Sequence, residues 1–202
     1  MSALRSGRQL VAAVRALLVA TVVLGIAYPL LMTGIAQVIA PSRADGSLVS
    51  RDGQVVGSSL IGQAFTTEDG DALPQWFQSR PSASSYDGAA SGGSNLGPNS
   101  PDLLKAVQER RVQVASFNGV SLDQVPADAV TASGSGLDPG ISPAYAAIQV
   151  HRVAFARGVP EAAVWELVDG ATHGRDLGFI GAPWVDVVEL NLALDERFGA
   201  AG

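Results

Sequence analysis

The chain has 202 residues, a net charge of −6 and no cysteine. It therefore has neither disulfides nor thiolate metal ligands, and its acidic balance argues against nucleic acid as a partner because the two would repel each other. Its length is sufficient for one domain with a hydrophobic core in addition to an anchor.

Residues 16–42 form an apolar segment without a single charged residue. A helix of this length can cross a bilayer and satisfies its backbone groups internally in lipid. The sequence thus predicts an N-terminal tail at residues 1–15, a transmembrane helix in contact with membrane lipid at 16–42 and a soluble domain at 43–202. A cleavable signal peptide is the alternative, because residues 42–44 offer small side chains, but the apolar run is longer than a usual signal-peptide core.

Charge is distributed unevenly about this segment. Arg5, Arg8 and Arg15 precede it, whereas all 19 acidic residues and 10 of the 13 basic ones follow it. The positive-inside rule then places the N-terminus in the cytoplasm. We expect a single-pass protein of the cell (inner) membrane whose main domain is extracytoplasmic.

Small or mildly polar residues recur at every fourth position of the predicted transmembrane helix. They are Thr21, Gly25, Pro29, Thr33 and Gln37. Membrane helices associate through such faces, because small residues let backbones approach and polar groups find partners there. The pattern predicts a partner inside the membrane, and a chance occurrence of Gly and Thr in an apolar sequence is the alternative. Pro29 is expected to bend the helix.

A β-hairpin is predicted at residues 47–65, where two short β-prone runs flank the tight-turn sequence Arg51-Asp52-Gly53. Residues 82–101 follow as a long loop, because Ser, Gly, Asn and Pro dominate them. Loops of this length in a compact domain are usually functional or disordered.

Capping residues and apolar spacing predict three helices in the remainder, at residues 101–118, 142–157 and 160–169. Residues 185–198 are predicted to form a short strand that leads into a helix. The buried face of the first helix is expected to contain Leu103, Leu104, Val107 and Val114, with Glu109, Arg110 and Arg111 in solvent. The fold class is therefore α+β, a single N-terminal transmembrane helix followed by one mixed α/β domain.

Motifs for independent catalysis are absent from the sequence. There is no G-x-S-x-G element, and Lys105, the only lysine, does not end a phosphate-binding loop. With only His151 and His173 and no cysteine, a zinc site made by the protein alone is not expected. We expect no catalytic residues, no bound metal and no covalent cofactor.

Two turns of small residues, 133–136 and 138–140, precede the helix that is predicted to begin near Ser142. Backbone amides and serine hydroxyls at such a place can bind an anion. The same turns can serve as rigid packing elements, which the residues alone favour.

Six sequence blocks follow one another in a definite order: residues 25–37, 57–65, 76–83, 91–98, 125–158 and 185–195. Together they resemble the C subunit (KdpC) of the bacterial Kdp-type potassium-transporting ATPase. Two positions depart from that pattern: Asp186 stands where the family usually has Asn, and the turn at 97–101 reads Gly-Pro-Asn-Ser-Pro instead of Gly-Pro-Thr-Asn-Pro. We interpret both as drift at packing or turn positions.

This resemblance implies a non-catalytic accessory subunit of a potassium pump, with a channel-like K⁺-binding subunit and a P-type ATP-hydrolysing subunit as partners. It further implies a catalytic chaperone that raises the ATP affinity of the hydrolysing subunit by sharing its ATP. The nucleotide-contacting residues that it implies are Ser133, Gly134, Ser135, Gly136 and Gln149.

The implied nucleotide role conflicts with the predicted topology, because ATP is cytoplasmic and these residues are expected on the other side of the membrane. We give more weight to the charge asymmetry. The domain is then expected to pack on the extracytoplasmic face of the K⁺-passing subunit and to stabilise assembly. A solitary bitopic cell-envelope binding module, which would use the 82–101 loop and need no pump partner, is the alternative.

Overall fold

The computed structural model describes residues 2–51 and 53–200. The chain divides into two compact units, Met1–Ser47 and Leu48–Gly202. The first unit is almost entirely helical, and the second is a mixed α and β domain, as the α+β fold class predicts.

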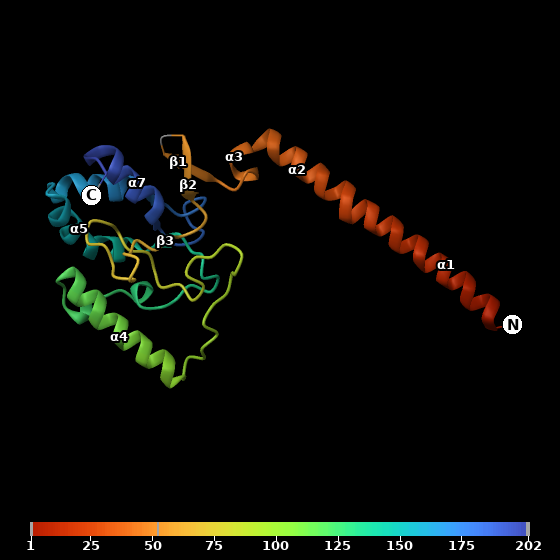
Figure 1. The fold of residues 1–202 in the computed structure, drawn as a ribbon, viewed down its shortest axis with the longest axis horizontal. Coiled ribbons are helices and arrows are strands. Elements are labelled where there is room, and N and C mark those ends of the chain that lie inside the picture. The colour runs from red at the N-terminus through yellow and green to blue at the C-terminus, as the bar shows by residue number, and fades with distance from the viewer. Residues whose placement is uncertain (1, 52, 201–202) are drawn as a thin grey trace. The chain divides into compact units, whose positions relative to one another are not determined.

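The first unit consists of one long continuous helix and a short final turn (Figure 1). Its segments are α1 (Ser2–Ala20), the π-helix η1 (Thr21–Ala27), α2 (Tyr28–Ile39) and α3 (Pro41–Ala44). Residues Gly7–Ile39 are long and apolar enough to cross a membrane. No residue of the most apolar stretch is buried by protein, which is the exposure expected of a helix that lipid or a partner covers.

Proline at position 29 changes the local form of this helix. Proline has no N–H, and its ring collides with the carbonyl of the residue four positions earlier, here Gly25. The π segment ends directly before this point, and the Tyr28 N–H donates to the Val23 carbonyl, five positions back. The sequence predicts a bend at Pro29, but the structure accommodates the proline by a wider turn, and the ribbon continues through it as one helix (Figure 1).

The second unit begins with a hairpin of β1 (Leu48–Arg51) and β2 (Gln54–Ser58), which pair antiparallel with an irregularity between Val49 and Ser50. The predicted hairpin is confirmed over residues 48–58, whereas residues 59–65, which the prediction includes, lie beyond its second strand. Its turn residue Asp52 lies outside the described residues.

A small antiparallel sheet and three helices form the core of the domain. The strands β3 (Gly140–Ile141), β5 (Trp184–Asp186) and β4 (Thr172–His173) are ordered β3-β5-β4. The helices are α5 (Pro143–Arg157), α6 (Glu161–Gly170) and α7 (Val187–Phe198). The side chains that are completely inaccessible include Val153, Val164, Val185, Leu190 and Leu194. The predicted helices and the predicted strand-to-helix passage near residue 185 are confirmed.

Helix α4 (Pro101–Asn118) ends at Gly119, whose positive φ of 66° suits a glycine cap. The predicted buried face of α4 is only partly correct. Leu104 is 56% exposed, because the buried positions of the helix, Ala115 and Asn118, lie at its other end. Arg110 is half-buried rather than in solvent, since its guanidinium donates to the Val130 carbonyl at 3.1 Å.

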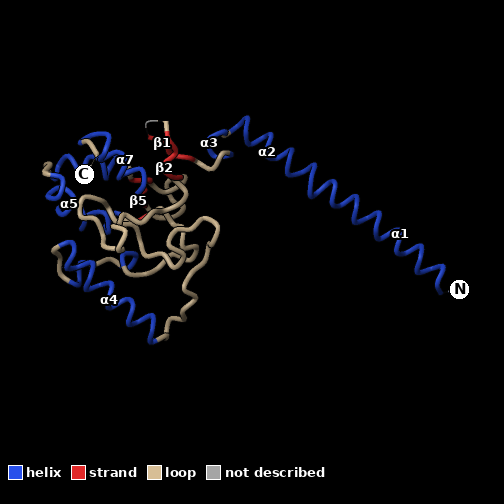
Figure 2. Tube along the Cα trace, viewed as in Figure 1, coloured by secondary structure: helices blue, strands red, loops and turns tan. Residues whose placement is uncertain are grey.

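Most of the segment between β2 and α4 is irregular, as the tan tube in Figure 2 shows. Residues 59–100 contain turns and isolated bridges but no described helix or multi-residue strand, which confirms the predicted loop at 82–101. The 3-10 helices η2 (Leu122–Gln124) and η3 (Ala127–Ala129) follow α4. Backbone groups buried in such a segment need partners other than a β-ladder.

Candidate functional site

Gln149, one of the residues implied to contact nucleotide, lies on α5 and is completely buried. Its Oε1 accepts a hydrogen bond from the Gln78 N–H at 2.7 Å, and its Nε2 donates to the Gln78 carbonyl at 3.1 Å. The amide thus pairs with both backbone groups of one residue, as a neighbouring strand would. Arg152, one turn further along α5, donates to the same Oε1 at 2.8 Å.

Asn191, on α7, pairs in the same way with the backbone of Phe77, the residue before Gln78. Its Oδ1 accepts from the Phe77 N–H at 2.9 Å, and its Nδ2 donates to the Phe77 carbonyl at 3.0 Å. Two buried amides from two helices therefore satisfy the backbone of two consecutive residues in the irregular segment. Phe77 itself is fully buried in the core.

Two arginines on α5 donate hydrogen bonds to the backbone carbonyls of residues 74–76, which directly precede Phe77. Arg152 donates to the carbonyls of Pro74 and Trp76, and Arg157 donates to the Gln75 carbonyl at 2.8 Å. Burial lowers the pKa of Arg152 to about 10, although hydrogen bonds satisfy its nitrogens. We name residues Pro74–Gln78 the clamped segment, because side chains of α5 and α7 bind its backbone at every residue.

The Ser/Gly turn at residues 133–136 lies against the long loop rather than beside Gln149. Gly92 N–H donates to the Ser135 carbonyl at 2.8 Å, and the Ser82 hydroxyl donates to the Gly136 carbonyl at 2.6 Å. Gly136 has φ of +70°, and a Cβ there would lie 2.3 Å from the Ser84 hydroxyl, so glycine is required. The described hydrogen bonds of Gln149 involve Gln78 and Arg152, none of them in this turn.

Ser133 is buried at the same place, whereas Gly134 is exposed. Ser133 is 4% exposed, and its hydroxyl is buried without a hydrogen-bond partner among the described residues. A Cβ on Gly93 would lie 3.0 Å from the Gly134 carbonyl oxygen, so loop and turn are in close contact. The geometry of all four turn residues is therefore that of a support for the 82–101 loop.

The start of α5, where free amides are expected from the sequence, is already capped. The Ser142 hydroxyl accepts from the Tyr145 N–H at 3.0 Å, and Asp128 accepts from both the Ser142 N–H and its hydroxyl at 2.7 and 2.9 Å. The protein's own carboxylate thus occupies the position that an anion would take.

An open groove of about 750 Å³ lies between α4 and the irregular segment. Its lining contains two arginines and three aromatic side chains, namely Arg80, Arg110, Tyr86, Phe117 and Tyr145. Burial raises the pKa of Tyr86 to about 12 and also raises that of Tyr145, so both phenols are neutral donors. Neither Gln149 nor the 133–136 turn lines this groove.

On the apolar helix, the predicted membrane partner face is exposed along its length. Thr21, Gly25, Pro29, Thr33 and Gln37 are all accessible, and a Cβ on Gly25 would contact only Thr21 within 4 Å. Gln37 also donates to the Asp45 carboxylate at 2.7 Å, which joins α2 to the turn after it. No other described part of its own unit therefore covers this face, so a partner helix can contact it.

Comparison with known proteins identifies the family. The family described as "K+-transporting ATPase, c chain" (KdpC) matches residues 10–196. The chain is similar to proteins named potassium-transporting ATPase KdpC subunit from three bacteria. The protein of Kineococcus radiotolerans is 57% identical, and the match covers 88% of both chains. The protein of Streptomyces coelicolor is 48% identical, and the match covers 95% of this chain and 93% of the relative. The protein of Beijerinckia indica is 51% identical, and the match covers 90% of both chains. The chain therefore belongs to the KdpC family of subunits of the K⁺-transporting ATPase.

Proposed function

We propose that this chain is a non-catalytic accessory subunit that stabilises the assembled potassium pump from outside the cytoplasm. The observation that carries the proposal is the 33-residue apolar helix, which is exposed within its own unit and which all 19 acidic residues follow in the sequence. The proposed partners are the channel-like K⁺-binding subunit and the P-type ATP-hydrolysing subunit of the same complex.

The membrane helix supplies the first proposed contact. Small residues on one face allow close approach of another helix, and the Thr33 hydroxyl can find a hydrogen-bond partner there. The Gln37 amide near the end of the face already bonds Asp45. This contact therefore depends chiefly on close packing at Gly25 and its neighbours.

The orientation follows from charge. Three arginines precede the uncharged segment 16–42, whereas the first charges beyond it, Arg43 and Asp45, are mixed in sign. The positive-inside rule favours a cytoplasmic N-terminus and an extracytoplasmic domain. The domain would then contact the outer face of the K⁺-passing subunit.

The chaperone role implied by the family is a second candidate, and the geometry supports an indirect form of it. Gln149 is enclosed and paired, so a direct contact with ATP would require the clamped segment to open. A subunit that binds one conformational state of a pump more tightly than another changes ligand affinity in that state by linkage. We propose that any gain in ATP affinity arises in this way, without bound nucleotide on this chain.

Co-purification tests the proposal. The chain is tagged at its C-terminus and expressed in its host at low potassium, and the membranes are extracted in mild detergent. Recovery with a P-type ATPase and a channel-like subunit, with K⁺-stimulated ATP hydrolysis, is expected. Recovery of the folded chain alone would contradict the proposal and favour the solitary binding module.

A further inference from the structure

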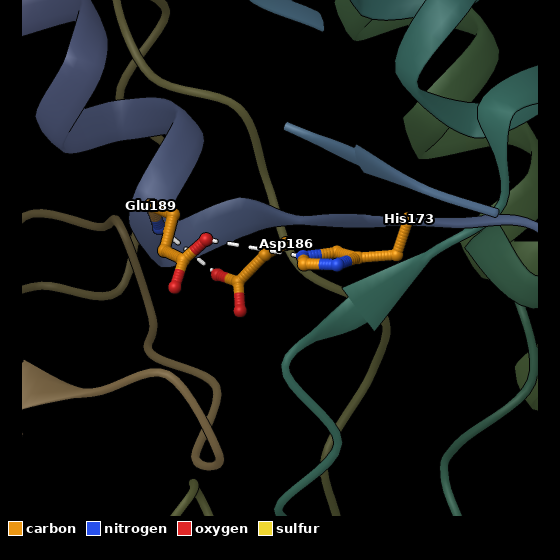
Figure 3. Close-up of side chains that lie close together, drawn as sticks. All are labelled: His173, Asp186 and Glu189. Atoms are coloured by element: carbon orange, nitrogen blue, oxygen red, sulfur yellow. Dashed lines mark hydrogen bonds and ion pairs between the residues drawn. The ribbon is translucent and has the colours of Figure 1, made fainter. Parts of the chain in front are cut away.

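Three side chains from β4, β5 and α7 meet at one point on the second unit: His173, Asp186 and Glu189 (Figure 3). One possible ligand atom from each lies within 4.8 Å of the other two. We propose that these residues form a binding site for a divalent transition metal of the Zn²⁺ class.

Strand pairing explains how residues so distant in sequence come together. In the register of β4 and β5, His173 is opposite Trp184, and the two rings stack at 4.3 Å. Asp186 is two residues after Trp184, so both side chains point to the same face of β5. The imidazole and the carboxylate therefore share one face of the sheet.

The start of α7 brings the third group. Asp186 is the N-cap of this helix, and its Oδ1 accepts from the Glu189 N–H at 2.9 Å. The cap places Glu189 above Asp186, where its Oε2 lies 3.8 Å from His173 Nε2. Figure 3 shows the Asp186 carboxylate near both the Glu189 carboxylate and the His173 ring.

The second oxygen of Asp186 is an independent indication of a ligand. Asp186 is 1% exposed, and its Oδ2 is buried without a hydrogen-bond partner among the described residues. A buried acceptor that lacks a partner is costly, and a cation would compensate it.

The donor set selects the kind of cation. One imidazole nitrogen with two carboxylate oxygens suits Zn²⁺ and its neighbours, whereas Mg²⁺ and Ca²⁺ prefer oxygen ligands alone. Ligands of tetrahedral zinc are about 3.3–3.5 Å apart, as follows from bond lengths of about 2.0–2.1 Å. The 3.8 Å pair is close to this spacing, and the side chains of His173 and Glu189, 47% and 43% exposed, are free to adjust around the fixed Asp186. Water would fill the remaining position.

Calorimetric titration of the full chain in detergent, purified without a histidine tag, tests the site with Zn²⁺ alone. One Zn²⁺ per chain is expected, with affinity reduced about 100-fold or more in Asp186→Asn, Glu189→Gln and His173→Gln, because even residues that only orient a ligand contribute 10–100-fold. Asp186→Asn retains an oxygen for the N-cap, so the helix start is preserved. Mg²⁺ is expected to bind far more weakly.

The chain offers a matched control. His151 and Glu161 form an exposed pair at 2.6 Å, and neither belongs to the three-residue group. His151→Gln should therefore leave Zn²⁺ binding unchanged. Absence of saturable binding by the unmodified chain, or loss of binding in His151→Gln but not in the three variants, would overturn the proposal.

Discussion

The side-chain amide of Gln149 hydrogen-bonds both the N–H and the carbonyl of Gln78. This pairing gives a buried, irregular backbone the two bonds that a β-strand would otherwise supply. Asn191 repeats it at Phe77. The buried amides of Gln149 and Asn191 therefore have a structural explanation that needs no ligand.

Replacement of Gln149 by Ala should destabilise the domain strongly. Two backbone groups of Gln78 would lose their partners, each at about 1–3 kcal/mol, so the free energy of unfolding should fall by about 2–6 kcal/mol. Denaturant unfolding of the full chain in detergent measures the change. Gln108→Ala on the exposed side of α4 is the control and should change stability by less than about 0.5 kcal/mol. An equal loss of stability in the two variants would refute the role of Gln149 in holding the clamped segment.

A buried ion pair joins α5 to α7. Arg157 and Asp195 are 3.1 Å apart, and their side chains are 3% and 4% exposed. Asp195→Asn should cost about 3–5 kcal/mol, because it leaves a buried charge without its partner. Glu166→Gln breaks the exposed pair with Arg197, at 2.7 Å, and should cost at most about 1 kcal/mol. Thermal unfolding of both variants compares them, and a cost at Glu166 as large as that at Asp195 would contradict this account.

Substitution on the small-residue face should weaken assembly. Ile at Gly25 would hold a partner helix away, so Gly25→Ile should reduce the recovery of the pump subunits with the tagged chain. Gly34 is nine residues, about two and a half helical turns, further on and so lies on the opposite side of the helix from Gly25. Gly34→Ile, where a Cβ meets nothing within 4 Å, is the control. If both variants assemble equally well, the face is not an interface.

The Tyr86 phenol should ionise at a higher pH than a free tyrosine. Its hydroxyl donates to the Arg80 carbonyl, and burial raises its pKa from 10.0 to about 12. Because the folded pKa is raised, its contribution to stability is complete below about pH 10 and is lost as the pH rises toward 12. Phenolate absorbance during alkaline titration, compared between the unmodified chain and Tyr86→Phe, isolates this group. A difference signal centred near pH 10 would show that the phenol is not buried.

Local signals made much of the fold predictable. The Ser100–Pro101 start and the Gly119 stop gave α4 its bounds, and the apolar spacing near Val185 gave the passage from β5 to α7. The predicted burial of Leu104 is wrong, because periodicity identifies an apolar stripe but not which end of it packs against the core.

The candidate sites were less predictable, because they depend on contacts between distant residues. Gln149 looks in the sequence like a surface glutamine on a helix, and its burial depends on Gln78, 71 positions earlier. In the sequence Asp186 has the character of drift at a packing position, whereas its approach to His173 follows from the pairing of β4 with β5. No sequence spacing encodes that register.

The orientation of the domain decides the central claim most directly. Because the chain contains no cysteine, Ser94→Cys in the exposed part of the 82–101 loop and Ser6→Cys in the tail each create a unique thiol. Intact cells that carry the complex are treated with a membrane-impermeant maleimide. An extracytoplasmic accessory subunit predicts labelling at position 94 and, only after lysis, at position 6. Labelling at position 6 with protection at position 94 would contradict it and return the nucleotide-contacting role to first place.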